Sequence, residues 1–163
     1  MLNPREGMLE ILRAAYPEVV LNDEVAYFGE VASLYSALAC SALFWPRLIE
    51  IDGAVFVALH GDDEFELANR FRSLVNKEGI HPHTSIWREW ISTFNKFEIV
   101  HLFNHWSGPQ NIMGPAAEAL GKVLVQTWSA RLRECYPTRT FEVELILDDG
   151  EESTRIVVRQ LSE

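Results

Sequence analysis

The sequence predicts a single α+β domain over residues 1–163, in which two β-hairpins form a small, mainly antiparallel sheet packed against about five helices. Two segments rich in Ile and Val each surround a turn sequence, and helical periodicity fills most of the remaining chain. Strands and helices do not alternate as they do in a parallel βαβ sheet. The expected order is ααββαααββ. A chain of 163 residues buries roughly 68–70% of its unfolded surface, so it needs no disulfide or metal for stability.

The N-terminal part of the chain predicts two helices. Residues 4–16 form the first, with leucines on one side and a proline directly after it. Asn22 or Asp23 can cap the second helix, because a short polar side chain accepts hydrogen bonds from the free N–H groups of the first turn. This helix runs to about Phe44 and is apolar nearly all round after Val31. We therefore expect it to be the central buried helix of the domain.

The first hairpin is predicted from residues 47–60, RLIEIDGAVFVALH. Two apolar runs flank Asp52-Gly53, a dipeptide that accepts the positive φ angles of a tight hairpin turn. The second run is more uniformly apolar, so its strand should lie deeper in the sheet. Residues 61–79 then form a helix that has acidic residues in its first turn and Gly79 at its end.

Two further helical segments follow. Residues 85–106 carry helical periodicity as one helix, or as two with a break near Lys96. A loop rich in Gly and Pro comes next. Pro115 suits a first helical position, and apolar residues then step by three and four to Cys135. This last helix is expected to be strongly amphipathic.

Residues 141–159 give the clearest pattern, because apolar and polar residues alternate on either side of the turn sequence DDGE. This alternation predicts a second hairpin. Its strands carry charged residues that would face each other, namely Glu142 and Glu144 on the first and Arg155 and Arg159 on the second. Each such cross-strand pair contributes roughly 0.2–1 kcal/mol.

Composition excludes several classes of protein. The net charge is −10, from 24 acidic and 14 basic residues, and no basic block occurs, so nucleic acid is not an expected ligand. The uncharged run that starts at Val31 is shorter than the ~20 residues of a membrane span. Cys40 and Cys135 lie far apart in apolar contexts, which predicts reduced core thiols in a cytoplasmic protein.

A metal site is one candidate for function. On a helix, Glu98, His101 and His105 would share one stripe, and this spacing can bring two imidazoles to a zinc or another transition-metal ion. Such an ion could activate water in a metal-assisted hydrolase. His81 and His83 would add two ligands if their loop folded over this stripe. The alternative is that these histidines only hydrogen-bond at the border of an apolar helix face.

Two other segments allow alternative functions. His60 precedes Asp62 and Asp63, so it could act as a general base, although acids at a helix start also serve capping. Trp87 and Trp90 lie three residues apart and could line a pocket for a small ligand. Most of the tryptophans should nevertheless belong to the core.

The leading hypothesis is an acidic protein-interaction domain that uses no cofactor. Acidic runs at 62–66 and 148–152 could form an electrostatic docking face for a basic protein partner. The most concrete version is a bacterial immunity protein or antitoxin that covers a basic active site. The expected partner-binding residues are Asp62, Asp63, Glu64, Asp148, Asp149 and Glu151.

Overall fold

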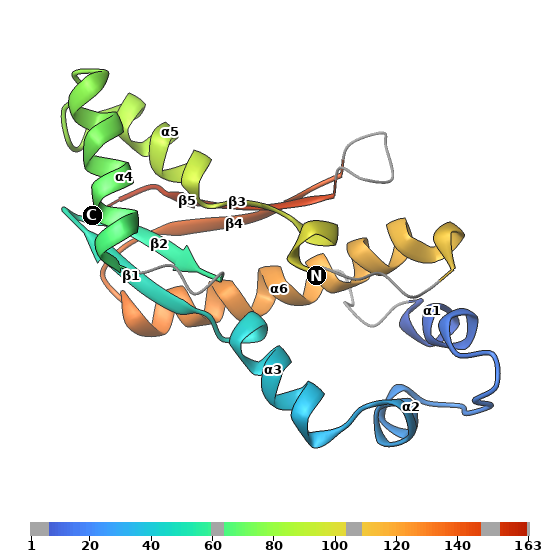
Figure 1. The fold of residues 1–163 in the computed structure, drawn as a ribbon. Coiled ribbons are helices and arrows are strands. Elements are labelled where there is room, and N and C mark those ends of the chain that lie inside the picture. The colour runs from blue at the N-terminus through green and yellow to red at the C-terminus, as the bar shows by residue number, and fades with distance from the viewer. Residues whose placement is uncertain (1–6, 60–63, 104–108, 148–153, 163) are drawn as a thin grey trace.

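The computed structural model describes residues 7–59, 64–103, 109–147 and 154–162, and these residues form an α+β fold (Figure 1). The described helices are α1 (Met8–Ala15), α2 (Glu24–Val31), α3 (Leu34–Phe44), α4 (Glu64–Lys77), α5 (Ser85–Phe94) and α6 (Met113–Cys135), with short 3₁₀ helices at Ile99–Leu102 (η1) and Gln110–Ile112 (η2). The described strands are β1 (Arg47–Ile51), β2 (Ala54–Ala58), β3 (Lys96–Glu98), β4 (Phe141–Ile146) and β5 (Arg155–Gln160). The predicted fold class is confirmed.

Both predicted hairpins are present. Strands β1 and β2 pair antiparallel around Asp52 and Gly53, whose φ angles of 50° and 83° are the positive values that a two-residue turn requires. Strands β4 and β5 also pair antiparallel. Arg159 of β5 contacts Glu142 at 3.1 Å and also Glu144, which confirms part of the expected cross-strand pairing.

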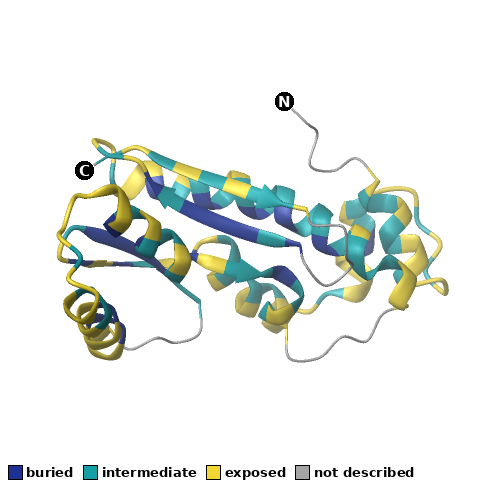
Figure 2. Ribbon diagram, turned by 90° about the horizontal axis from the view of Figure 1, so that it is seen from above, coloured by how far each residue is buried: buried dark blue, intermediate teal, exposed yellow. Residues whose placement is uncertain are grey.

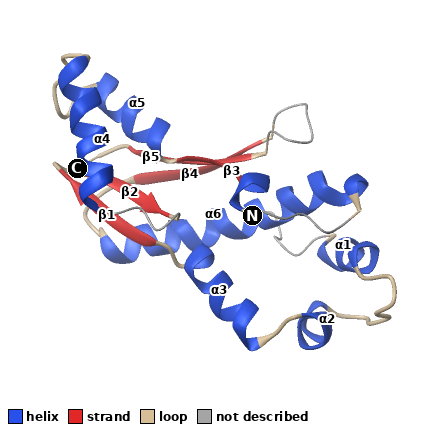
Figure 3. Cartoon of the chain, viewed as in Figure 1, coloured by secondary structure: helices blue, strands red, loops and turns tan. Residues whose placement is uncertain are grey.

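The strands form two sheets, which corrects the expectation of one. Strands β1 and β2 make a two-stranded sheet, and β3, β5 and β4 make a three-stranded sheet in that order (Figure 3). The outer edge of β2 meets side-chain amides instead of another strand. This explains why the sheets do not merge: the backbone groups that would pair with a neighbouring strand already have partners.

Two buried amide side chains bridge the sheets. Asn95 accepts a hydrogen bond from the Val57 N–H at 2.9 Å and donates one to the Val55 carbonyl at 2.8 Å. Gln160 accepts from the Val55 N–H at 3.0 Å and donates to the Gly53 carbonyl at 2.9 Å. Asn95 is 1% exposed and Gln160 is 2% exposed. We call these four hydrogen bonds the amide bridge.

The segment after Phe94 differs from the helix that periodicity predicts. Asn95 ends α5 by donating its N–H to the Ile91 carbonyl, and its own carbonyl accepts from the Val158 N–H. The next residues form β3, which pairs with β5 instead of continuing the helix. Tertiary contacts decide this, because Phe97 of β3 packs edge-on against Trp128 with ring centroids 5.5 Å apart. The expected break near Lys96 is therefore real, but a strand and a 3₁₀ turn follow it.

The central buried helix is α6, not the segment 23–44. Its buried residues are spaced by three and four: Ala117, Gly121, Leu124, Trp128 and Leu132. A Cβ on Gly121 would lie 2.7 Å from the end of the Ile99 side chain and would also crowd Leu145 of β4, so glycine lets η1 and β4 pack closely on α6. In Figure 2 buried residues gather in the strands and along α6, whereas the N-terminal helices are mostly exposed or half-buried.

The segment predicted as one buried helix is two helices that are largely exposed, although Tyr27 of α2 is buried. Ser33 caps α3 by accepting from the Ser36 N–H at 3.1 Å, and the Ser36 hydroxyl accepts from the Ser33 N–H at 2.7 Å. This reciprocal cap separates α3 from α2. On α3, Leu34 is 81% exposed and Leu38 is 69% exposed. We call residues 8–44, which contain α1, α2 and α3, the N-terminal arm.

We expect Asn95→Ala to lower the free energy of unfolding by about 2–5 kcal/mol, because it leaves the buried Val57 N–H and Val55 carbonyl without partners and opens a small cavity. Urea denaturation measures this change. Asn76→Ala, on the exposed face of α4, is the matched control and should change stability by less than about 0.5 kcal/mol. Equal effects of the two substitutions would mean that the amide bridge does not stabilise the fold.

Candidate functional site

The predicted metal ligands do not lie on one helix. Glu98 is the last residue of β3, and His101 lies in η1. The two nevertheless touch: His101 Nδ1 lies 2.8 Å from Glu98 Oε2. The second oxygen of Glu98 lies 3.5 Å from Arg155 Nε. His105 lies outside the described residues, so the predicted set of three stays a prediction.

The other histidines take separate positions. His83 has a φ of 69°, and its ring lies 5.4 Å from that of Trp87. His81 lines a cavity of about 490 Å³ together with Arg72 and Trp87. Trp87 is itself 1% exposed and belongs to the core that α4, α5 and the first hairpin share. Across the residues that the structure describes, no group of three or more His, Cys, Asp or Glu side chains is arranged to hold a metal ion.

Of the predicted partner-binding acids, only Glu64 lies in the described part of the chain. It begins α4 and pairs with Arg47 at 3.2 Å, with both side chains about 60% exposed. The other five, Asp62, Asp63, Asp148, Asp149 and Glu151, lie outside the described residues, as does His60. The structure therefore leaves the acidic docking face as a prediction.

The cysteines also occupy different environments. Both are free, but Cys40 is half-buried and Cys135 is exposed. The expectation that both are core thiols is wrong for Cys135, because the last turn of α6 extends beyond the residues that bury its middle.

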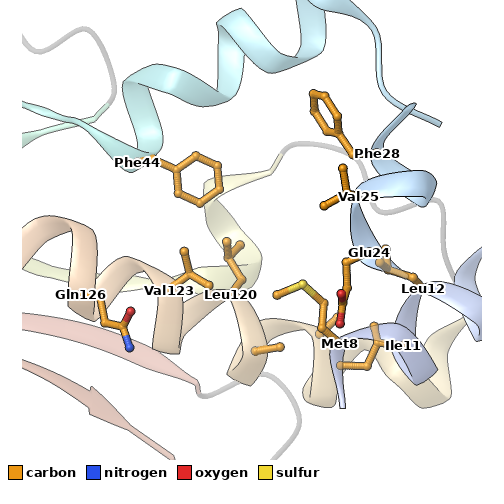
Figure 4. Close-up of a pocket in the computed structure, with 12 residues that line it drawn as sticks. Met8, Ile11, Leu12, Glu24, Val25, Phe28, Phe44, Leu120, Val123 and Gln126 are labelled. Carbon is orange, nitrogen blue, oxygen red and sulfur yellow. The ribbon is translucent and has the colours of Figure 1, made fainter. Parts of the chain in front are cut away.

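A groove lined mainly by apolar side chains lies between the N-terminal arm and α6 (Figure 4). It has a volume of about 580 Å³. Its walls come from four helices: Met8, Ile11 and Leu12 of α1, Glu24, Val25 and Phe28 of α2, Phe44 of α3, and Ala116, Ala119, Leu120, Val123 and Gln126 of α6. Only Glu24 and Gln126 among these side chains are polar. We call this feature the arm groove.

The N-terminal arm, which supplies three of the four groove walls, carries net negative charge. Residues 7–46 contain five carboxylates and a single cation, Arg13. The Arg13 guanidinium donates to the Leu21 carbonyl at 3.3 Å and to the Asn22 side chain at 3.4 Å, so it fixes the loop between α1 and α2. Among the carboxylates, Asp23 caps α2 by accepting from the Ala26 N–H. Glu24 projects from the first turn of the same helix into the groove.

Sequence reasoning missed the arm groove for a physical reason. Its walls come from segments up to about 120 residues apart, and no local pattern joins them. Of the long uncharged run between Glu30 and Arg47, which we expected the fold itself to bury, only Phe44 lines the groove.

The chain matches no protein-family model, and no curated protein or solved structure matches it significantly. None of the described helices is long and apolar enough to span a membrane.

Proposed function

We propose that the protein is an interaction domain that holds a basic, amphipathic segment of a protein partner in the arm groove. The observation that carries this proposal is an open apolar groove that is lined by one carboxylate, Glu24, and is built largely from a chain segment with five carboxylates and one cation. A bacterial immunity protein or antitoxin, which neutralises a basic protein by covering its functional surface, is the most concrete form of this function.

The lining of the arm groove suits a helix. Amphipathic helices bind other proteins by placing their apolar face in a groove between helices, with anchors spaced by three and four residues. Phe28 and Phe44 stand opposite Leu120 of α6 and offer apolar surface on both sides (Figure 4). Phe28 is 58% exposed and Val25 is 70% exposed, so a partner would remove much apolar area from water.

Charge selects the class of partner. The protein carries −10 overall, and the only cation of the arm, Arg13, is already bound to the α1–α2 loop. A segment with Lys and Arg beside its apolar face would meet Glu24 within the groove and the net negative charge of the arm around it. An acidic segment of the same shape would be repelled, and the affinity for the basic one should fall as salt rises.

The test uses a designed amphipathic peptide of about 18 residues, long enough for five helical turns, with leucines on one face and Lys and Arg on the other. We expect micromolar binding by isothermal titration calorimetry. Phe28→Ser should weaken it at least about tenfold, since an apolar anchor is lost. Val20→Ser also replaces an exposed apolar side chain by serine, at a residue that is 87% exposed and is not among those lining the groove, and it should leave binding unchanged.

A matched peptide with Glu in place of every Lys and Arg should bind at least about tenfold more weakly. Equal binding of the two peptides, or equal loss in Phe28→Ser and Val20→Ser, would contradict the proposal.

The contact between Glu98 and His101 supports a second candidate, a metal-binding domain or metal-assisted hydrolase that includes His105. A carboxylate that holds one ring nitrogen of a histidine orients the other toward a metal, as in many zinc sites. Such a domain would bind zinc or another transition metal.

In that case the purified, untagged protein should retain about one equivalent of metal after dialysis against a weak chelator. The double substitution of His101 and His105 by alanine should remove the metal, whereas His83→Ala should not. Metal content is measured by atomic emission. A metal-free wild-type protein, or a double variant that keeps its metal, would exclude this candidate.

A further inference from the structure

We propose that the protein also binds a small organic anion, with a carboxylate or phosphate group on a flat apolar body, in a cavity between α3, the first hairpin and α6. The cavity has a volume of about 500 Å³ and shares no lining residue with the arm groove. We call it the arginine cavity, after Arg47 and Arg131, which line it. This inference goes beyond the proposed function, because it concerns a different site and a ligand of the opposite charge.

Three parts of the fold meet at the arginine cavity, where α3 ends and β1 begins beside α6 (Figure 1). Trp45 caps the end of α3, where its N–H donates to the Ser41 carbonyl at 2.9 Å. Arg47 starts β1 and lies opposite Ala58 of β2 in the hairpin. Arg131 reaches the cavity from α6. The fold therefore brings together two cations that are far apart in the sequence.

The charge of the arginine cavity is opposite to that of the protein as a whole. The chain carries −10, yet the charged side chains among the described residues that line the cavity are both arginines. The arm groove, by contrast, is lined by Glu24. A cavity whose described lining holds two cations and no carboxylate attracts an anion and repels a cation.

Arg131 keeps donors that the protein does not use. Its guanidinium lies over the Trp45 ring, 5.5 Å from the ring centroid, and this attraction holds the group without using a directional N–H bond. Its Nη1 donates to Glu134 at 2.9 Å. Within the described residues, Nε is buried without a hydrogen-bond partner and Nη2 has none either. Nη2 is therefore available to an anion, and the planar fork of arginine suits carboxylate and phosphate oxygens.

Arg47 adds a second, more exposed cation. It pairs with Glu64 at 3.2 Å, and both side chains are about 60% exposed. Exposed ion pairs of this kind are weak, because water screens them. Glu64 is not among the residues that line the cavity. An anion in the cavity can therefore share Arg47 with Glu64 or take its place.

The rest of the lining selects the body of the ligand. Leu48, Ala58 and Leu59 give the cavity an apolar wall, and Trp45, which is 47% exposed, adds an aromatic surface. A flat apolar ring system packs favourably against such surfaces while its acidic group meets the arginines. The volume of about 500 Å³ lies within the roughly 300–1,000 Å³ of pockets that hold small molecules.

An NMR titration with naphthalene-2-carboxylate tests the inference. The ligand should shift the indole N–H signal of Trp45, which Trp45→Phe assigns, with a dissociation constant below about 1 mM. Naphthalene-2-carboxamide has the same shape but no charge. It should bind at least about tenfold more weakly, since it cannot form charge-assisted hydrogen bonds with the arginines. Naphthalen-2-yl phosphate is the phosphate probe, and the anion that binds more tightly identifies the acidic group.

Substitutions separate the two arginines from the general charge of the protein. Arg47→Gln and Arg131→Gln should each weaken binding of the anion at least about fivefold. The matched control is Arg133→Gln, the same change at an exposed residue of α6 that does not line the cavity, and it should leave binding unchanged. Glu64→Gln should leave binding unchanged or strengthen it, because it removes the competitor for Arg47 and keeps both cations.

Equal binding of the acid and the amide would overturn the inference, as would an equal loss of binding in Arg47→Gln and Arg133→Gln. A Trp45 indole signal that neither anion shifts would also overturn it. Arg47 is exposed and does not stack on Trp45, so its substitution tests the site without disturbing the contact between α3 and α6. None of these results bears on the arm groove, whose test uses a basic peptide and different residues.

Discussion

The rest of the structure depends on the amide bridge that Asn95 and Gln160 make to the edge of β2. These two side chains replace a neighbouring strand, so they satisfy buried backbone groups of β2 and hold the two sheets beside each other. Strand β2 can then be buried on both sides. Ala54 and Phe56 pack into the core that α4 and α5 cover, whereas Val55 and Val57 pack into the core around α6. Without the bridge, buried backbone groups of β2 would lose their partners, and the first hairpin would be held to the α6 core only by apolar packing and by Arg139, which binds Glu50.

The arm is arranged differently. Helices α1 and α3 both contact α6, and the arm groove opens between these helices and α2 (Figures 1 and 4). The arm therefore leaves apolar side chains of α1, α2 and α3 facing one groove, and Glu24 is the carboxylate among its lining residues. A basic amphipathic segment would match both properties.

Much of the fold could be predicted from local patterns. The Asp52-Gly53 turn, the alternation in β4 and β5, and the three-and-four spacing of α6 each depend on neighbouring residues alone. Strand β3 could not be predicted, because three residues carry no periodicity and pairing with β5 decides their conformation. The apolar composition of α3 predicted a core helix. Composition shows how apolar a helix is, but it does not show whether other parts of the same chain pack around it. The arm groove joins four separate helices, so no local pattern could indicate it.

Hydrogen exchange of the Val55 and Val57 amides tests the amide bridge most directly. Both N–H groups lie on the outer edge of a two-stranded sheet. Amides at such an edge that lack a hydrogen-bond partner exchange rapidly, by local opening of the strand. If the buried side chains of Gln160 and Asn95 hold them, both amides should exchange only through global unfolding, as slowly as the amide of Leu124 in α6. Exchange at the rate of an exposed strand edge would contradict the bridge and the two-core arrangement that depends on it.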